Sequence, residues 1–255
     1  MWVPGVAWLS SMMSTMMIVQ RFLPSDRIEW LTRTYTRGQV LLSGSRVHYH
    51  VHPGVDPERV YMFAQNHVNM LDHCTCYNGT PHFKQGIELA AHFDVPFYGW
   101  FMRQRGTIPV FRDAKDGVRK LVDGVKAEVD RGHSILVFPE GTRTRSGRVG
   151  KFQSGVFRVA QKLELPIVPT AVTGMFEVMR TGEPFINPGY EVNVYFDEPI
   201  ETKGTTEAEL PDIIERAQAA VTRRVDAYYA SRGGYPPLEP TEDEAPEQPQ
   251  TSRAS

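Results

Sequence analysis

The chain has 255 residues, 41% of them hydrophobic, a length that suits one α/β domain with a sizeable core. Its 28 Lys and Arg residues against 30 Asp and Glu residues argue against a nucleic-acid partner, which usually requires a basic surface. The two cysteines, Cys74 and Cys76, suit neither a disulfide framework nor, alone, a four-ligand zinc site. They favour a reducing, cytosol-facing compartment.

Residues 1–20 carry no charge and are rich in Met, Trp and Val. A signal peptide would begin with a basic residue, but the first one, Arg21, follows the apolar segment. A spanning helix needs about 20 apolar residues, and this segment is interrupted by Pro4 and Gly5. An interfacial anchor fits better, because basic and aromatic residues that suit anionic headgroups follow: Arg21, Arg27, Trp30, Arg33, Tyr35 and Arg37. A helix packed on the protein's own core is the alternative.

The apolar patterns predict the elements in chain order. Residues 2–36 predict a helical hairpin that turns at Pro24, with Ser25 or Asp26 capping its second helix. Two strands that we expect to pair follow at 47–51 and 60–64. Further strands are expected at 87–91, 107–111, 135–138, 167–172 and 192–196, and helices at 115–131, 154–163 and 207–231. This alternation predicts an α/β fold with a mixed central sheet flanked by helices.

Three segments follow from these patterns. We expect residues 1–36 to form membrane-associated helices that dock on the lipid surface, and residues 37–232 to form the main α/β domain. Residues 233–255 are dense in Pro, Glu and Asp, a composition typical of a disordered tail.

The segment Asn66-His67-Val68-Asn69-Met70-Leu71-Asp72 directly follows the second predicted strand. An imidazole can remove a proton near neutral pH, and a carboxylate on its other nitrogen fixes the tautomer. Five positions apart on one helix, two side chains diverge by about 140°, so His67 must lie in the turn before a helix and Asp72 in its first turns. A strand-turn-helix supplies this geometry. Taken alone, the spacing also fits a surface turn.

Two further segments carry arginines at strand ends. In Phe138-Pro139-Glu140-Gly141-Thr142-Arg143, the carboxylate can hold polyol hydroxyls, and the guanidinium matches the oxygens of a phosphate. Residues 105–112 end another short strand with Arg112, which is a second candidate ligand for a phosphate.

Together these segments resemble the lysophosphatidic acid acyltransferase family of the glycerolipid acyltransferase superfamily. The resemblance covers about residues 60–200 and rests on four motifs in family order. They are Asn-His-x-x-x-x-Asp at Asn66 to Asp72, Gly-x-Ile-x-x-x-Arg at Gly106, Ile108 and Arg112, Phe-Pro-Glu-Gly-Thr-Arg at Phe138 to Arg143, and Val-Pro at Val168 and Pro169.

The resemblance implies that His67 is the general base and that Asp72 orients it. It also implies direct attack of the acceptor hydroxyl on an acyl thioester, in keeping with the lack of a Gly-x-Ser-x-Gly nucleophile elbow. Backbone amides near His67 would stabilise the oxyanion. The implied acceptor site consists of Gly106, Arg112, Glu140, Gly141, Thr142 and Arg143, with both arginines on the phosphate.

By the same resemblance, acyl-CoA or acyl carrier protein is the co-substrate, and no metal or other cofactor takes part. An acidic carrier protein or the phosphates of coenzyme A would suit the basic residues Arg119, Lys120, Arg145, Arg148 and Lys151. The expected reaction is acylation of lysophosphatidic acid to phosphatidic acid at the cytoplasmic face of a membrane. The chain departs from the family at Asn69 and Pro109, so another lysolipid or glycerol 3-phosphate is an alternative acceptor.

Two other classes stay open. A non-catalytic protein that binds anionic lipid would use the same arginines and N-terminal helices. A metal-dependent hydrolase would draw its ligands from His48, His50, His52, His67, Asp72, His73, Cys74 and Cys76. The alternation of the first three histidines with Tyr49 and Val51 is more typical of a polar sheet face.

Overall fold

The computed structural model describes residues 2–111, 116–183 and 185–237. The helices are α1 (Trp2–Val19), α2 (Glu29–Leu42), α3 (Asp72–Cys76), α4 (Tyr98–Arg105), α5 (Gly117–Val129), α6 (Ser154–Lys162), α7 (Met175–Val178) and α8 (Leu210–Ala230). The strands are β1 (Arg46–Val51), β2 (Met62–Gln65), β3 (Lys84–Leu89), β4 (Ile108–Val110), β5 (Ser134–Val137), β6 (Ile167–Thr173) and β7 (Glu191–Phe196). Short 3₁₀ helices cover Ala90–Asp94 and Glu207–Glu209.

The strands form one sheet in the order β1-β7-β6-β2-β5-β3-β4. All neighbours run parallel except β6 and β7, which are antiparallel, so the predicted mixed sheet is confirmed. The expected pairing of the first two strands is wrong, because β1 pairs with β7 at the sheet edge while β2 lies between β5 and β6. Such a central strand is buried on both faces, and all four residues of β2 are buried.

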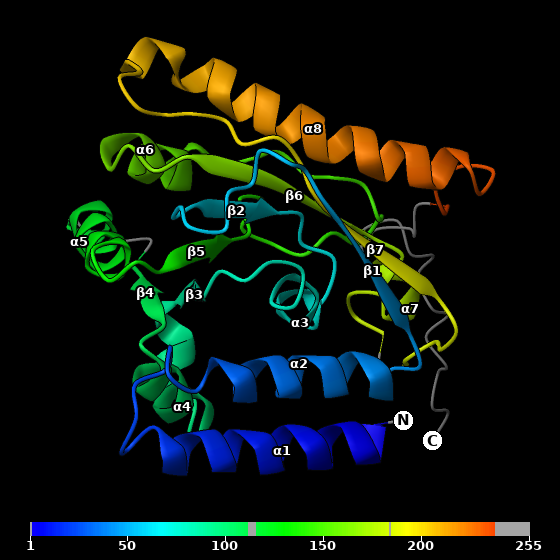
Figure 1. The fold of residues 1–255 in the computed structure, drawn as a ribbon. Coiled ribbons are helices and arrows are strands. Elements are labelled where there is room, and N and C mark those ends of the chain that lie inside the picture. The colour runs from blue at the N-terminus through cyan, green and yellow to red at the C-terminus, as the bar shows by residue number, and fades with distance from the viewer. Residues whose placement is uncertain (1, 112–115, 184, 238–255) are drawn as a thin grey trace, which may run out of the picture.

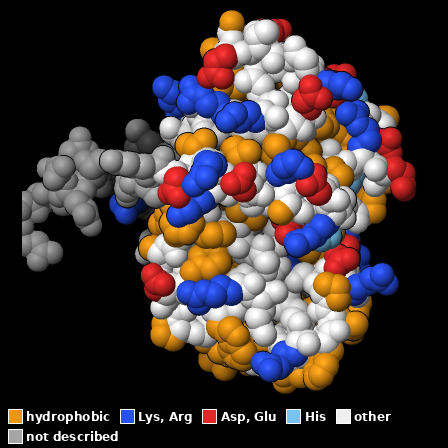
Figure 2. Space-filling model, turned by 90° about the vertical axis from the view of Figure 1, so that its left-hand side faces the viewer, with side chains coloured by type: hydrophobic (Ala, Val, Ile, Leu, Met, Phe, Trp, Pro, Cys, Tyr) orange, Lys and Arg blue, Asp and Glu red, His pale blue; other side chains and the backbone are white. Residues whose placement is uncertain are grey.

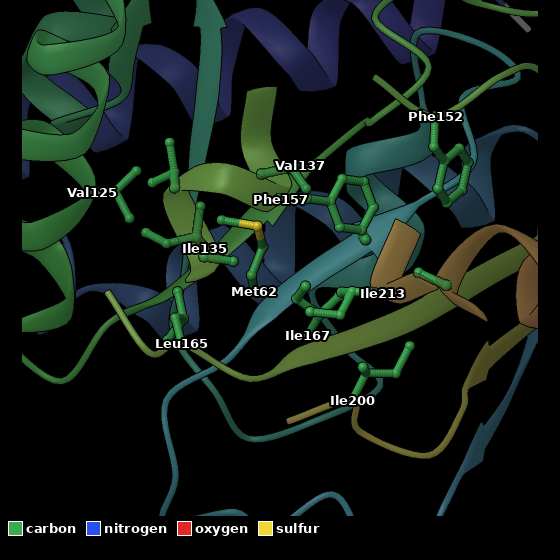
Figure 3. Packing of buried hydrophobic residues seen from close by; sticks show 14 of the residues in the cluster. Met62, Val125, Ile135, Val137, Phe152, Phe157, Leu165, Ile167, Ile200 and Ile213 are labelled. Atoms are coloured by element: carbon green, nitrogen blue, oxygen red, sulfur yellow. The ribbon is translucent and has the colours of Figure 1, made fainter. Parts of the chain in front are cut away.

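Helices cover both faces of the sheet (Figure 1). On one face, α5, α6 and α8 enclose a core that includes Met62, Ile135, Ile167 and Phe157, each at most 1% exposed. Figure 3 shows these side chains interlocking between the strands and the helices. On the other face, β2 contributes Phe63 to a second core that includes α7. Because β2 is anchored on both faces, its carboxyl end is a rigid place from which to project a loop.

The predicted N-terminal hairpin is present, with α1 and α2 side by side below the sheet in Figure 1. Its second helix has no side-chain cap and begins at Glu29, so the predicted capping by Ser25 or Asp26 is wrong. The Ser25 hydroxyl instead donates to the Arg105 carbonyl at 3.0 Å, which ties the interhelical loop to α4. Helix α2 continues to Leu42, past residue 36, and the division of the chain at that residue stays a prediction.

Helix α1 presents apolar side chains on both of its faces. Its inner methionines, Met13 and Met16 among them, share a core cluster with Cys74 of α3 and Phe101 of α4. On its outer face, Val3, Val6 and Ile18 are exposed by 83%, 49% and 63%. Figure 2 shows hydrophobic side chains at the lower end of the molecule, where Figure 1 places α1. Helix α1 therefore packs on the protein and also leaves an apolar outer face uncovered.

Among the described residues, no helix combines the length and the apolar character needed to cross a membrane. The predicted acidic tail lies outside the described residues from position 238 onward.

Candidate active site

The segment between β2 and α3 forms the predicted strand-turn-helix. Strand β2 ends at Gln65 and α3 begins at Asp72, so His67 lies in the turn and Asp72 is the first residue of the helix. The Gln65 side chain donates to the Asp72 backbone carbonyl at 3.1 Å, which binds the end of the strand to the start of the helix. The geometric condition set by the five-residue spacing is thus met.

His67 and Asp72 form a hydrogen-bonded pair. The distance between His67 Nδ1 and Asp72 Oδ2 is 2.7 Å, and the aspartate side chain is 1% exposed while that of the histidine is 22% exposed. Burial raises the pKa of Asp72, and the hydrogen bonds from His67, Asn69 and Val68 act in the opposite direction. The carboxylate fixes the tautomer that places a lone pair on Nε2, the nitrogen able to accept a proton from a hydroxyl.

One carboxylate oxygen organises the whole turn. Besides the imidazole, Asp72 Oδ2 accepts the backbone N–H groups of Val68 at 2.6 Å and Asn69 at 3.0 Å. The other oxygen, Oδ1, is buried with no hydrogen-bond partner among the described residues, in keeping with the raised pKa. The amides of Val68 and Asn69 are therefore occupied by a carboxylate, and the expectation that backbone amides near His67 serve an oxyanion stays a prediction for the other amides of the turn.

Two asparagines fasten the turn to neighbouring elements. The Asn66 side chain donates to the Val172 carbonyl at 3.0 Å and accepts the Val172 N–H at 2.7 Å, a two-point contact with β6. Asn69 donates to the carbonyls of Met175 and Met179 at 2.7 and 3.1 Å. Asn69 is 1% exposed, so this departure from the family pattern has a packing role and its side chain faces α7.

Glu140, on the loop after β5, also reaches the turn. Its Oε1 accepts the His67 N–H at 2.8 Å and its Oε2 accepts the Gly150 N–H at 2.7 Å. The residue is 8% exposed, and burial raises its pKa against these two hydrogen bonds. Phe138, at the start of the same loop, stacks on the His67 ring with centroids 4.2 Å apart. The loop therefore contacts the histidine through both its backbone and its ring.

The remaining predicted site residues are distributed as follows. Thr142 and Arg143 are exposed on the loop after β5. The next residue of this loop, Thr144, donates its backbone N–H to the His67 carbonyl at 2.9 Å. Gly141 belongs to the same loop and has a φ of 72°, a left-handed conformation that favours glycine.

Gly106 occupies a different place. It ends α4 with a φ of 79° and precedes β4, which β5 and β3 separate from β2. The left-handed φ suits a glycine that ends a helix, and a Cβ at this position would also lie 2.9 Å from the Gln85 side-chain nitrogen. The remaining prediction, Arg112, lies outside the described residues.

Two histidines of the hydrolase alternative, His48 and His50, lie elsewhere, on the edge strand β1. His50 of β1 contacts Asn193 of β7 at 3.0 Å, and His48 pairs with Glu191, both on an exposed surface. Within the described ranges, no three His, Cys, Asp or Glu side chains are grouped so that they could hold a metal ion. The structure therefore does not bring these histidines together with the His67–Asp72 pair.

Sequence reasoning missed the contributions of Phe138 and of the Glu140–Gly150 contact. Phe138 was visible as the first residue of the Phe-Pro-Glu-Gly-Thr-Arg segment, but nothing in the spacing showed that its ring would lie on the histidine. Gly150 follows that segment without a motif of its own.

These features define an α/β protein with a histidine–aspartate pair at the exit of a central strand. The model of the acyltransferase family matches residues 46–173, half of the sequence. The chain therefore belongs to the acyltransferase family. This span includes the turn that carries His67 and the whole loop that carries Glu140 and Arg143.

The chain is similar to two chloroplastic proteins named 1-acyl-sn-glycerol-3-phosphate acyltransferase. It is 34% identical to the one from Brassica napus over 153 residues, which are 58% of this chain and 42% of that protein. It is 36% identical to the one from Arabidopsis thaliana over 152 residues, 58% of this chain and 41% of that protein. The matched part is thus less than half the length of these relatives.

The fold is also similar to a solved structure, the crystal structure of the 1-acyl-sn-glycerophosphate acyltransferase of Thermotoga maritima. The TM-score is 0.68 and the sequence identity 19%, with 84% of this chain and 87% of that chain covered. At this identity the comparison shows similarity of fold alone. The similarity covers more of the chain than the family match does.

Proposed function

We propose that the chain is an O-acyltransferase that moves a fatty acyl group from an acyl thioester to lysophosphatidic acid, giving phosphatidic acid. The observation that carries this proposal is the 2.7 Å bond between His67 Nδ1 and the buried Asp72, which leaves Nε2 as the proton acceptor. The names of the relatives from Brassica napus and Arabidopsis thaliana support the choice of acceptor.

The reaction needs two proton transfers, both through His67, and one acyl transfer. His67 Nε2 takes the proton of the acceptor hydroxyl while the hydroxyl oxygen attacks the thioester carbonyl, and Asp72 stabilises the imidazolium that forms. The C–S bond then breaks, and the leaving thiolate receives the proton from His67. The products are an ester and a free thiol, so no acyl-enzyme is required.

Arg143 is the residue that we assign to the phosphate of the acceptor. It is exposed and lies one position before Thr144, whose amide donates to the His67 carbonyl at 2.9 Å. Its planar donors suit two phosphate oxygens at once. The loop that carries it is therefore fixed to the histidine that would deprotonate the acceptor.

The acyl donor and the membrane complete the proposal. The exposed cations Arg145, Arg148 and Lys151 follow Arg143 on the same loop and suit the phosphates of coenzyme A or an acidic acyl carrier protein. The uncovered apolar face of α1 suits docking on the cytoplasmic face of a membrane, where the lipid acceptor resides. Sedimentation with anionic vesicles, compared between the wild type and Val3→Asp, measures this docking, and equal binding by both proteins would count against it.

The proposed reaction is tested by incubating labelled acyl-coenzyme A with lysophosphatidic acid in detergent micelles and identifying the lipid product. We expect phosphatidic acid from the wild type and none above background from His67→Ala. Failure of the wild type with both coenzyme A and carrier-protein donors, while it still binds anionic vesicles, would favour the lipid-binding alternative.

Arg143→Gln separates the acceptors. With lysophosphatidic acid we expect the KM to rise about tenfold or more, because a charge-assisted hydrogen bond is worth about 1.5–3 kcal/mol. With monoacylglycerol, which lacks the phosphate, the change should be within about twofold. Equal effects on the two acceptors would remove Arg143 from the phosphate site.

A further inference from the structure

The loop after β5 holds both polar groups of the His67 backbone. Glu140 Oε1 accepts the His67 N–H at 2.8 Å, and the Thr144 N–H donates to the His67 carbonyl at 2.9 Å. The residues between these two anchors are Gly141, Thr142 and Arg143. A single loop therefore fixes the peptide of the histidine and presents the arginine beside it.

Both carboxylate oxygens of Glu140 accept hydrogen bonds from backbone amides. Its Oε2 accepts the Gly150 N–H at 2.7 Å, and the side chain is almost completely buried. Among the described residues, no Lys or Arg forms a salt bridge with it. A carboxylate in such surroundings bears a large desolvation cost, which the two amide donors offset only in part.

The far end of the loop is shaped to receive this carboxylate. A Cβ at Gly150 would lie 2.8 Å from Glu140 Oε2, so a side chain at this position would displace the oxygen. Three residues further on, the Gln153 N–H donates to the Pro139 carbonyl at 2.8 Å, which closes the loop at its base. The carboxylate of Glu140 thus lies inside a closed loop and is directed at the histidine backbone.

We propose that Glu140 is a positioning residue, which fixes the His67 backbone against the loop that carries Arg143 and so sets the imidazole relative to the acceptor. This inference rests on the proposed acyl transfer and gives Glu140 a task other than contact with the acceptor hydroxyls. The acceptor then meets a base and a phosphate ligand whose separation is set by one loop.

Steady-state kinetics of Glu140→Gln test the assignment. The amide keeps the size of the side chain but offers only one oxygen, so one of the two backbone N–H groups meets an NH₂ group instead. Displacement of a catalytic group by about 1 Å can cost about 100-fold in rate. We therefore expect kcat to fall by about 10–100-fold while the KM for lysophosphatidic acid stays within about twofold.

The pH profile of kcat distinguishes positioning from a direct effect of charge. If Glu140 positions the histidine, Glu140→Gln lowers the whole profile and leaves the pH of its acidic midpoint in place. A midpoint that moves to lower pH would show that the negative charge itself stabilises the imidazolium, and the positioning role would fall.

Gly150→Ala provides a second, independent variant, since it keeps Glu140 and crowds its Oε2. We expect the same pattern, a lower kcat with an unchanged KM, at a melting temperature that shows a folded protein. An increase in KM with kcat retained in either variant would place Glu140 on the acceptor and overturn the inference. A wild type that makes no phosphatidic acid in the same assay would instead overturn the proposed function.

Discussion

His67 and the histidines of β1 differ in their position on the sheet and in the exposure of their partners. His67 follows β2 at the centre of the sheet, and its carboxylate partner is 1% exposed. His48 lies on the edge strand β1, and its partner Glu191 is 50% exposed. Its neighbour on the same face, His50, stacks on Tyr195 with centroids 4.5 Å apart and contacts Asn193.

The difference lies in the partner and its surroundings. Water competes for an exposed ion pair, so a surface His–Glu contact is worth little and does not hold one tautomer. The Asp72 carboxylate is shielded from water and also bonded to two backbone amides, so its position does not depend on the histidine alone. A histidine becomes a base with a defined geometry when its carboxylate is held independently.

Removing one histidine from each region tests this difference. We expect His67→Ala to lower kcat by about 10²–10⁴-fold, the usual worth of a general base. His50→Ala should stay within about twofold, and it serves as the matched control. Acyl transfer to lysophosphatidic acid measures both, with circular dichroism to verify folding. A similar loss in the two variants would mean that the edge histidines take part in the reaction.

The carboxylates can be compared in the same way. Asp72→Asn should lower kcat by about 10²–10³-fold, because the amide can present an NH₂ group to Nδ1 and so favour the wrong tautomer. Glu191→Gln, the exposed counterpart, should change kcat by less than about twofold. Kinetics at saturating donor measure this difference, and full activity of Asp72→Asn would exclude an orienting role for the carboxylate.

The local geometry of the pair was predictable because spacing and secondary structure decide it. A helix interior could not bring His67 and Asp72 together, so the strand exit had to, and the structure places them there. The partner strands were not predictable in this way. The expectation that β1 pairs with β2 followed from their adjacency in sequence, whereas the chain returns β7 to β1 from more than a hundred residues away.

The contacts that hold the turn depend on residues far apart in the chain. Asn66 meets Val172, and Glu140 meets both His67 and Gly150. A linear pattern shows that an amide or a carboxylate is present, but its partner depends on which strands become neighbours. This is why the sequence suggested that Glu140 binds a polyol. In the structure both of its carboxylate oxygens already accept backbone N–H groups.

The anchoring of the central turn should appear in stability as well. Asn66→Ala would leave the buried N–H and C=O of Val172 without partners, at a cost of about 2–4 kcal/mol in the free energy of unfolding. Asn193→Ala, on β7 beside the edge strand β1, should cost less than about 0.5 kcal/mol. Urea unfolding measures both differences, and an equal loss would show that the turn is no better anchored than the edge.

The smallest effect concerns His73, which follows Asp72 but has no carboxylate on its ring. Its Nε2 lies 3.4 Å from the Tyr35 hydroxyl and 3.3 Å from Cys74 Sγ. Burial, together with the charge of Arg105, lowers the pKa of His73 from 6.5 to about 4. The unfolded chain therefore binds a proton here at a higher pH than the folded chain does, so stability falls as the pH drops from 6.5 towards 4.

A pKa difference of this size corresponds to about 3 kcal/mol, and because the residue as a whole is only partly buried we expect about 1–2 kcal/mol. In His73→Gln this loss between pH 6.5 and pH 4 should be reduced by that amount, with the stability at pH 8 as the reference within each protein. Urea unfolding at several pH values measures the slope. If stability depends on pH equally in both proteins, His73 is protonated as readily in the folded chain as in the unfolded one. Burial of the imidazole would then not disfavour its protonation.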